Sequence, residues 1–345
     1  MLNSISYFFF LSAYSDFFGI EPSYVDQNKQ YTRPDASSFY IHENSYLNIQ
    51  GGAISFAPYT ASDILLESCI FGNCTSIVNG GCLYLYNVKN VILHRICCYN
   101  CYTGGSGNLG YIYSINRDEI HFVSASGTSP VTMGTGVFYL YYYNHVLKNN
   151  NISQCKASCS AFIYCDRVKT LNAIMNNICD CTCSDSQMYY IGAYPDTSYF
   201  NHSNFINNSG TIYGLFYFYY YAFNFIFYES IFQNNKGNLF ATDGNPTVTV
   251  NNCWIVHNVL QYSITKGLKI TLNSGISYTS THVISLHSTY ECQTIENPLG
   301  FEVTPHRTFP NPPTECFVVE SNIGGTHLLM TVLAIKLTIL ELLFT

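Results

Sequence analysis

The sequence predicts an all-β protein that folds as a single-stranded, right-handed parallel β-helix, a solenoid of about eight or nine coils with roughly 26 residues each. The first observation is a short strand of alternating apolar residues and tyrosines that recurs along the chain. The second is the near-constant spacing of these strands. The third is the composition, with 31 Tyr and 24 Phe, because aromatic side chains fit the pleated surface of a sheet.

The repeat is visible when the chain is divided before each recurring strand. The first seven segments are 29, 27, 29, 25, 27, 26 and 25 residues long. Propeller blades need about 40–50 residues, and leucine-rich repeats would show a leucine framework that is missing here. The segments begin at Gly51, Gly80, Gly107, Gly136, Ala161, Met188, Gly214 and Leu239.

Each coil is expected to contain three short strands separated by turns. In the second coil these are "CLYLY", then "VILHR" after a turn at Asn87 and Asn90, then "ICCYNC". Stacked coils would pair each strand in parallel with its counterpart about 4.8 Å away, so that apolar residues line a continuous interior. The right-handed winding follows the general preference of parallel crossovers.

Composition and charge exclude several classes of protein. Hydrophobic residues make up 48% of the 345 residues and charged residues only 10%, which excludes intrinsic disorder. The formal net charge is -7, with only 14 Lys and Arg. Nucleic acid is therefore not expected as a partner, because binding to phosphates depends on clustered cations.

The two ends of the chain predict an extracellular protein held at a membrane. Residues 1–15 are a candidate signal peptide with a small-residue cleavage site before Asp16, and the alternative is a buried first strand. Leu328 to Phe344 is an apolar-dominated stretch of 17 residues, the short limit for a transmembrane helix. A lipid-anchor signal and an amphipathic surface helix remain alternatives for this stretch.

The expected organisation is a signal peptide (1–15), a parallel β-helix (16–276), a Pro-rich stalk (277–326) and a C-terminal hydrophobic helix as transmembrane anchor (327–345). A Pro-rich segment forms a stiff, extended spacer. The expected location is therefore the cell surface, with the β-helix extracellular. In that compartment four sequons are candidate glycosylation sites: Asn73, Asn151, Asn201 and Asn207.

The 15 cysteines are predicted to be core residues with some disulfides between coils. Cys179, Cys181 and Cys183 could pair with Cys155 and Cys159 of the adjacent coil. A metal site is not expected, because zinc sites favour two separated C-x2-C pairs and only one such pair, from Cys98 to Cys101, is present. In the stalk, Cys292 and Cys316 are candidates for a disulfide.

Short motifs in the coils resemble those of a known group of proteins. "GGAISF" (Gly51 to Phe56) and "NGGCLYL" (Asn79 to Leu85), with the Phe-x-x-Asn units Phe205 to Asn208 and Phe232 to Asn235, are similar to the repeats of polymorphic outer membrane protein-type β-helices. The chain also resembles right-handed β-helix surface proteins of parasitic protists and, more widely, the pectin-lyase-like fold. This resemblance implies adhesion or surface display.

A column of tyrosines is the candidate binding site. Strand alternation places these tyrosines on the outside, because their neighbours are mostly aliphatic residues or Phe that suit the interior. Such a ladder can serve only to stabilise the sheet, or it can bind sugars or a protein partner through large, rigid side chains. The column consists of Tyr84, Tyr111, Tyr139, Tyr164, Tyr190 and Tyr217, spaced 27, 28, 25, 26 and 27 residues apart.

Catalytic residues are not predicted, and neither is a cofactor. Enzymes of the pectin-lyase-like fold need grouped carboxylates and a cation on one strand face. The candidate groups fall in different coils: Asp118 and Glu119 beside Arg117, Asp166 with Arg167, and Asp180 with Asp185.

The expected function is non-enzymatic adhesion or ligand binding at a membrane surface, with glycans or proteins of a host or neighbouring cell as partners. The alternatives are a polysaccharide lyase or glycoside hydrolase, and a structural surface-coat protein.

Overall fold

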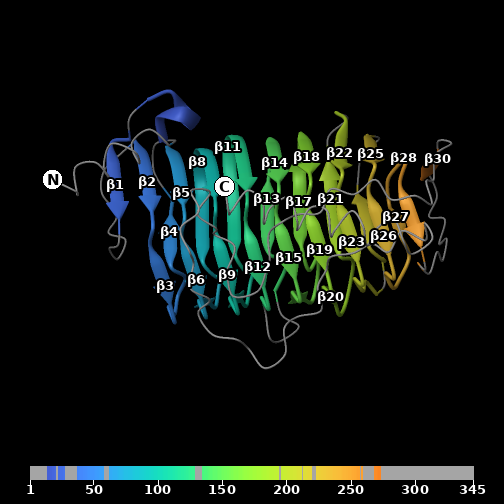
Figure 1. Ribbon diagram of the computed structural model, residues 1–345, viewed down its shortest axis with the longest axis horizontal. Helices are drawn as coiled ribbons and strands as arrows, with labels where there is room; N and C mark the ends of the chain where they lie inside the picture. Colours follow the sequence, from blue (N-terminus) through green and yellow to red (C-terminus); the bar gives the residue numbers. More distant parts are fainter. Residues whose placement is uncertain are drawn as a thin grey trace, which may run out of the picture.

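The computed structural model describes residues 14–20, 22–27, 37–57, 62–128, 134–193, 196–211, 213–219, 223–256, 258 and 268–272. These residues form a parallel β-solenoid of about 8 turns with almost no helix. The strands lie side by side along the long axis and follow one another in sequence order from β1 to β30 (Figure 1). The prediction of a β-solenoid is therefore confirmed.

Three parallel ladders form the walls of the solenoid, and successive coils add their strands to these ladders in order. The first ladder contains β4 (Ile54–Phe56), the first halves of β8 (Leu83–His94) and β11 (Gly110–His121), β13 (Phe138–Tyr141), β17 (Ile163–Val168), β21 (Tyr189–Ala193), β24 (Phe216–Tyr219) and β27 (Phe240–Thr242).

The second ladder contains β1 (Tyr24–Gln27), β2 (Ser38–His42), β5 (Asp63–Glu67), the second halves of β8 and β11, β14 (Asn144–Lys148), β18 (Thr170–Ile174), β22 (Ser198–Asn201), β25 (Asn224–Tyr228), β28 (Thr247–Asn251) and β30 (Lys269–Leu272).

The third ladder contains β3 (Ser45–Leu47), β6 (Ile70–Gly72), β9 (Cys97–Tyr99), β12 (Ser124–Ser126), β15 (Asn151–Ser153), β19 (Asn177–Cys179), β23 (Asn204–Ile206), β26 (Ile231–Gln233) and β29 (Trp254–Val256). Two further pairs follow this ladder, β7 (Thr75–Ser76) with β10 (Tyr102–Thr103) and β16 (Lys156–Ala157) with β20 (Thr182–Cys183).

In the second and third coils, one continuous strand runs through both the first and the second ladder, contrary to expectation. Instead of two strands separated by a turn at Asn87 and Asn90, β8 is one strand of 12 residues. Asn87 has a φ of 60° within it, and the pairing of β8 with β11 shifts register just beyond Tyr113. The expected turn is therefore a β-bulge, which bends the strand without ending it.

The corners between the second and third ladders place bulky residues in the left-handed backbone region. Arg95, Phe122 and Met175 each have a φ of 56°, a conformation that costs a non-Gly residue about 1 kcal/mol. The backbone N–H of Phe122 donates to the Lys148 carbonyl at 3.0 Å, and that of Met175 to the Asn201 carbonyl at 2.9 Å. Hydrogen bonds to the next coil therefore hold these corners in place.

The interior is a continuous apolar core whose composition changes along the rod. In the N-terminal coils it is mainly aliphatic, with residues such as Leu83, Leu85 and Ile112. In the C-terminal coils it is mainly phenylalanine, and the Phe216 ring stacks on Tyr189 at 4.2 Å and meets Phe227 edge-on at 4.9 Å.

The predicted terminal segments lie mostly outside the described residues. Residues 14–18 form a short helical turn, in which Tyr14 is buried against Tyr40 and Leu65. Residues 1–13, the Pro-rich stalk, the Cys292 and Cys316 pair and the C-terminal anchor are not among the described residues. Within the described ranges, no helix has the length and apolarity needed to cross a bilayer.

Candidate functional site

The six tyrosines of the predicted column lie in register on the first ladder. Tyr84 pairs with Tyr111, which pairs with Tyr139. The series continues through Tyr164 and Tyr190 to Tyr217. The strand residues on either side of them, such as Leu83 and Leu85, are buried in the core. The tyrosines therefore project from the outer face of the ladder.

The rings of the column stack on one another along the rod. Tyr111 lies 4.8 Å from Tyr139 with an interplanar angle of 10°, and Tyr139 lies 4.8 Å from Tyr164 at 9°. Tyr164 and Tyr190 are closer still, at 4.1 Å and 4°. Because each ring covers the face of the next, the middle of the column presents ring edges and hydroxyl groups to a partner.

The column is not exposed along its whole length, contrary to expectation. Tyr190 and Tyr217 are only 7% and 5% exposed. Tyr219 packs against Tyr190, and Tyr213 lies 4.7 Å from Tyr217, whose hydroxyl donates to the Asp243 carboxylate. Tyr190 and Tyr217 therefore lie on the outer face of the ladder but are covered by neighbouring side chains. The accessible part of the column runs from Tyr84 to Tyr164.

At the N-terminal end of the column the stack stops and a pocket begins. The residue that pairs with Tyr84 in the preceding coil is Ser55, so the register provides no ring there. Tyr84 and Ser55 line a pocket with Asn79 and Val78, together with Gly51, Gly52, Ile54 and Gly80. In the loop beside it, Ile77 is 92% and Val78 64% exposed.

The glycines of the "NGGC" motif shape this loop. Gly80 has a φ of 75°, which glycine adopts without a steric cost. A Cβ atom on Gly81 would lie 2.1 Å from the carbonyl oxygen of Asn108. Only glycine fits where the loop returns to the interior before Cys82.

The tyrosine hydroxyls are hydrogen-bond donors at neutral pH. Burial raises the pKa of both Tyr111 and Tyr164 to about 12. A second, partial column lies beside the first, where Tyr113 packs 4.8 Å from Tyr86 and 5.3 Å from Tyr141. The accessible face therefore carries aromatic edges with protonated hydroxyl groups.

The second ladder carries a row of histidines and carboxylates that the sequence analysis did not find. Glu67 Oε1 lies 3.0 Å from His94 Nδ1, and Tyr40 donates a hydrogen bond of 2.5 Å to Glu67 Oε2. In the next coil, His121 Nε2 lies 3.2 Å from Glu119 Oε2. Burial would raise the pKa of Glu67, but hydrogen bonds from His94 and Tyr40 lower it below its ordinary value.

This row is largely shielded from solvent. The His94 ring lies between the rings of Phe17 and Phe122, each at 5.6 Å. Arg117 contacts Glu119, whose side chain is 9% exposed. The histidine spacing of 27 residues, one coil, was the signal that could have revealed this row.

The predicted carboxylate groups do not converge on one site. Asp118 and Glu119 point to opposite faces of their strand. Asp118 lies in the interior, 2.9 Å from His145, and both side chains are 0% exposed. Asp166 pairs with Tyr141, on the outer face of the first ladder.

Most cysteines are buried thiols in the interior. Cys155, Cys159, Cys181 and Cys183 are free thiols, so the disulfides expected between them do not form. Cys179, the fifth cysteine of that prediction, is disulfide-bonded, and so is Cys97. Cys155 and Cys181 belong to one column at the corner after the third ladder, the position that asparagine occupies in Phe-x-x-Asn. The column contains Cys74, Cys101, Thr128, Cys155, Cys181, Asn208, Asn235 and Asn258.

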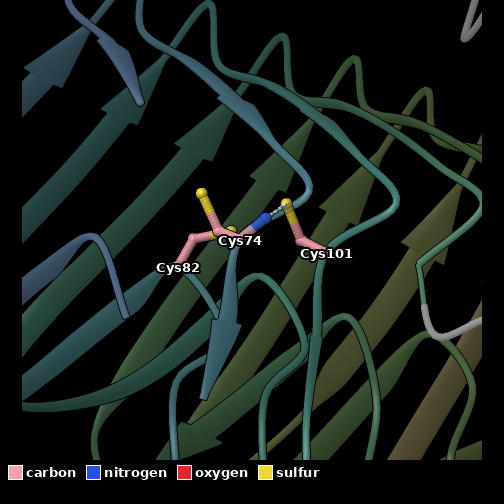
Figure 2. A group of neighbouring side chains, drawn as sticks. All are labelled: Cys74, Cys82 and Cys101. Atoms are coloured by element: carbon pink, nitrogen blue, oxygen red, sulfur yellow. Dashed lines mark hydrogen bonds between the residues drawn. The ribbon is translucent and has the colours of Figure 1, made fainter. Parts of the chain in front are cut away.

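Four of the buried cysteine thiols lie close together. Figure 2 shows Cys74, Cys82 and Cys101, whose Sγ atoms all lie within 4.8 Å of one another. Cys98 Sγ is 3.9 Å from Cys82 Sγ. Burial disfavours the Cys98 thiolate, but hydrogen bonds from Cys101 and Cys82 lower its pKa to about 6. The sequence analysis identified only the Cys98 and Cys101 pair.

The four sequons differ in accessibility. Asn73 and Asn207 are exposed residues at corners of the solenoid, and Asn201 is half-buried. Asn151 is 2% exposed and accepts a hydrogen bond of 2.9 Å from the side chain of Asn177. Glycosylation stays a prediction, and Asn73 and Asn207 offer the most room for a glycan.

Comparison with family models, with curated proteins and with solved structures gave no match. The functional argument therefore rests on the geometry of this chain.

Proposed function

We propose that this protein is a non-enzymatic surface protein that binds glycans or proteins of a host or neighbouring cell. The observation that carries the proposal is the end of the tyrosine column. Tyr84 is the first ring of the stack and lines a pocket, because Ser55 replaces a tyrosine in the preceding coil. An aromatic face open to a pocket can stack on the apolar face of a sugar ring.

The surroundings of Tyr84 support a glycan as the ligand of this pocket. Ser55 and Asn79 offer hydroxyl and amide groups for hydrogen bonds. A Cβ atom on Gly51 would meet nothing within 4 Å, so there is room for a ring near the backbone at this residue. Exposed Ile77 and Val78 extend the apolar surface at the rim. The recess therefore combines apolar surface with several polar groups that can fix the orientation of a small ligand.

The placement of the rod at the cell surface is part of the same proposal and rests on sequence features alone. A right-handed rod would stand on the Pro-rich stalk (277–326), and residues 327–345 would hold it at the cell surface. The stalk would then present the pocket and the tyrosine edges at a distance from the membrane.

An enzyme acting on acidic polysaccharide is the second candidate. It is favoured by the row of Glu67, His94, His121 and Glu119, which brings two carboxylates and two imidazoles to one face of the second ladder. The shielding of His94 by Phe17 and Phe122 argues against it. A structural surface-coat protein is the third candidate, favoured by the burial of Tyr190 and Tyr217.

The test is retention of the full chain on a panel of glycans and cell-surface proteins, with acidic polysaccharides assayed for cleavage in parallel. Tyr84→Ser is expected to lower affinity by about two- to tenfold, since an aromatic contact is worth roughly 0.5–1.5 kcal/mol. Tyr139→Ser is the matched control, because it removes a ring from the middle of the same column and leaves the pocket intact.

Equal retention by wild type and Tyr84→Ser would contradict a pocket ligand. Retention lost only in Tyr139→Ser would move the ligand to the tyrosine edges. Cleavage that survives Tyr84→Ser and disappears in Glu67→Gln would replace the binding protein with an enzyme.

A further inference from the structure

The thiol cluster draws on distant parts of two coils. Cys74 follows β6, Cys82 precedes β8, and Cys98 and Cys101 flank the end of β9. Cys74 and Cys101 occupy the same corner of successive coils, since β7 and β10, which follow them, are paired. The fold therefore adds two cysteines to a C-x2-C pair.

One distance between sulfur atoms matches that of a tetrahedral metal site, and three sulfurs lie within reach of one ion. Zinc–sulfur bonds of about 2.3 Å place tetrahedral sulfurs about 3.8 Å apart. Cys82 Sγ and Cys98 Sγ are 3.9 Å apart, and the Sγ atoms of Cys74, Cys82 and Cys101 lie within 4.8 Å of one another. Cys98 lies outside the group of three sulfurs that are mutually within 4.8 Å, so its side chain has to move toward the group to complete a four-sulfur site.

The environment of the cluster is that of a closed structural site. All four cysteines are at most 1% exposed, so the cluster is shielded from bulk solvent. The backbone N–H of Cys74 donates to Cys101 Sγ at 3.4 Å, so this sulfur also links the two coils. Elsewhere in the described ranges, His, Cys, Asp and Glu side chains form no comparable group of three.

We propose that Cys74, Cys82, Cys98 and Cys101 form a tetrathiolate site for a soft divalent cation, with Zn²⁺ as the ion. Thiolate ligands select zinc over magnesium or calcium, which prefer oxygen. Each cysteine that coordinates the ion releases its thiol proton to solvent. No electron transfer is involved.

An ion bound at this site would stabilise the loop that forms the pocket at Tyr84. Residues 75–81 connect Cys74 to Cys82, so one ion would hold both ends of this loop. The same loop carries Val78, Asn79 and Gly80 of the pocket. Metal binding itself does not depend on the proposed ligand and is measured without it.

The experiment is a cobalt titration of the full chain, purified under reducing and metal-free conditions. Co²⁺ bound by four thiolates gives strong charge-transfer and visible d–d absorption, and Zn²⁺ added afterwards should displace it. Wild type is expected to take up one ion per chain and to release protons on binding. Cys98→Ser should weaken binding at least tenfold. Cys253→Ala, a buried free thiol outside the cluster, is the matched control and should bind as wild type does.

Several outcomes would overturn the proposal. One is the absence of thiolate-type absorption in reduced wild type. Another is equal binding by Cys98→Ser, which would place the ion elsewhere. A third is mass spectrometry of native protein that finds Cys82 bonded to Cys98 and Cys74 to Cys101, with no metal bound. To guard against misfolding, the double variant Cys74→Ala/Cys101→Ala is compared with wild type by circular dichroism. A folded double variant that keeps the absorption would also reject the site.

Discussion

The corner after the third ladder is built with sulfur in the N-terminal coils and with amides in the C-terminal coils. Asn235 donates its amide to the Phe205 carbonyl at 2.7 Å and accepts the backbone N–H of Asn208 at 2.9 Å. Cys101 makes the equivalent contacts through Sγ, with the Phe71 carbonyl at 3.5 Å and the backbone N–H of Cys74 at 3.4 Å.

This difference shows what the corner requires. The side chain must be small, must donate to a carbonyl of the preceding coil and must accept an N–H from it. Asparagine meets both needs with strong hydrogen bonds, whereas a thiol is a weak donor and a weak acceptor. The N-terminal coils therefore have weaker polar links between coils and sulfur ligands that can bind an ion.

The largest expected effect concerns the aromatic core of the C-terminal coils. Phe216→Ala should lower the free energy of unfolding by about 4 kcal/mol, because the ring packs against Tyr189, Phe205 and Phe227. Leu83→Ala, at the same ladder position in the N-terminal coils, should cost about 3 kcal/mol. Urea denaturation measures both losses, and a greater loss for Leu83→Ala would reverse the proposed difference between the two cores.

A smaller effect is expected at the corner itself. Asn235→Ala should lower the free energy of unfolding by about 3 kcal/mol, since buried backbone groups of Phe205 and Asn208 lose their partners. Cys155→Ala, in the same column, should cost about 1 kcal/mol. Similar losses in urea denaturation would mean that the thiol is as good a link as the amide.

The smallest expected effect is a pH dependence in the N-terminal coils. Burial, together with repulsion from His94 and Lys148, lowers the pKa of His121 from 6.5 to about 4. Although Glu119 lies close to His121, Arg117 already neutralises that carboxylate. The unfolded chain therefore binds more protons than the folded one between these pH values, and stability falls as the pH falls through them.

We expect a loss of roughly 2 kcal/mol between pH 6.5 and pH 4.5. The measurement is the urea midpoint at each pH, and His121→Gln should flatten the dependence. An equally steep dependence in His121→Gln would assign the loss to other groups in the row, such as Glu67.

Much of the fold was predictable because the repeat is local. The strands of each coil have the same alternation of side chains. Because strands of successive coils pair in parallel, residues 25–29 positions apart in the sequence lie beside each other in a ladder. The bulge at Asn87 and the left-handed conformations of Phe122 and Met175 were not predictable, because hydrogen bonds to the next coil stabilise them.

The candidate site was only partly predictable, because some of its contacts come from residues outside the repeat. The in-register stacking of the tyrosines follows from spacing, but the covering of Tyr190 and Tyr217 depends on Tyr213, Tyr219 and Asp243, which break the repeat.

By itself, the sequence determined the solenoid, the tyrosine register and one C-x2-C pair, all of which follow from regular spacing along the chain. Only the tertiary structure decided which tyrosines stay accessible, that Glu67 meets His94, and that Cys74 and Cys82 join Cys98 and Cys101. These contacts join loops and corners of different coils. Their positions depend on how the chain packs around a turn of the solenoid, which spacing alone does not encode.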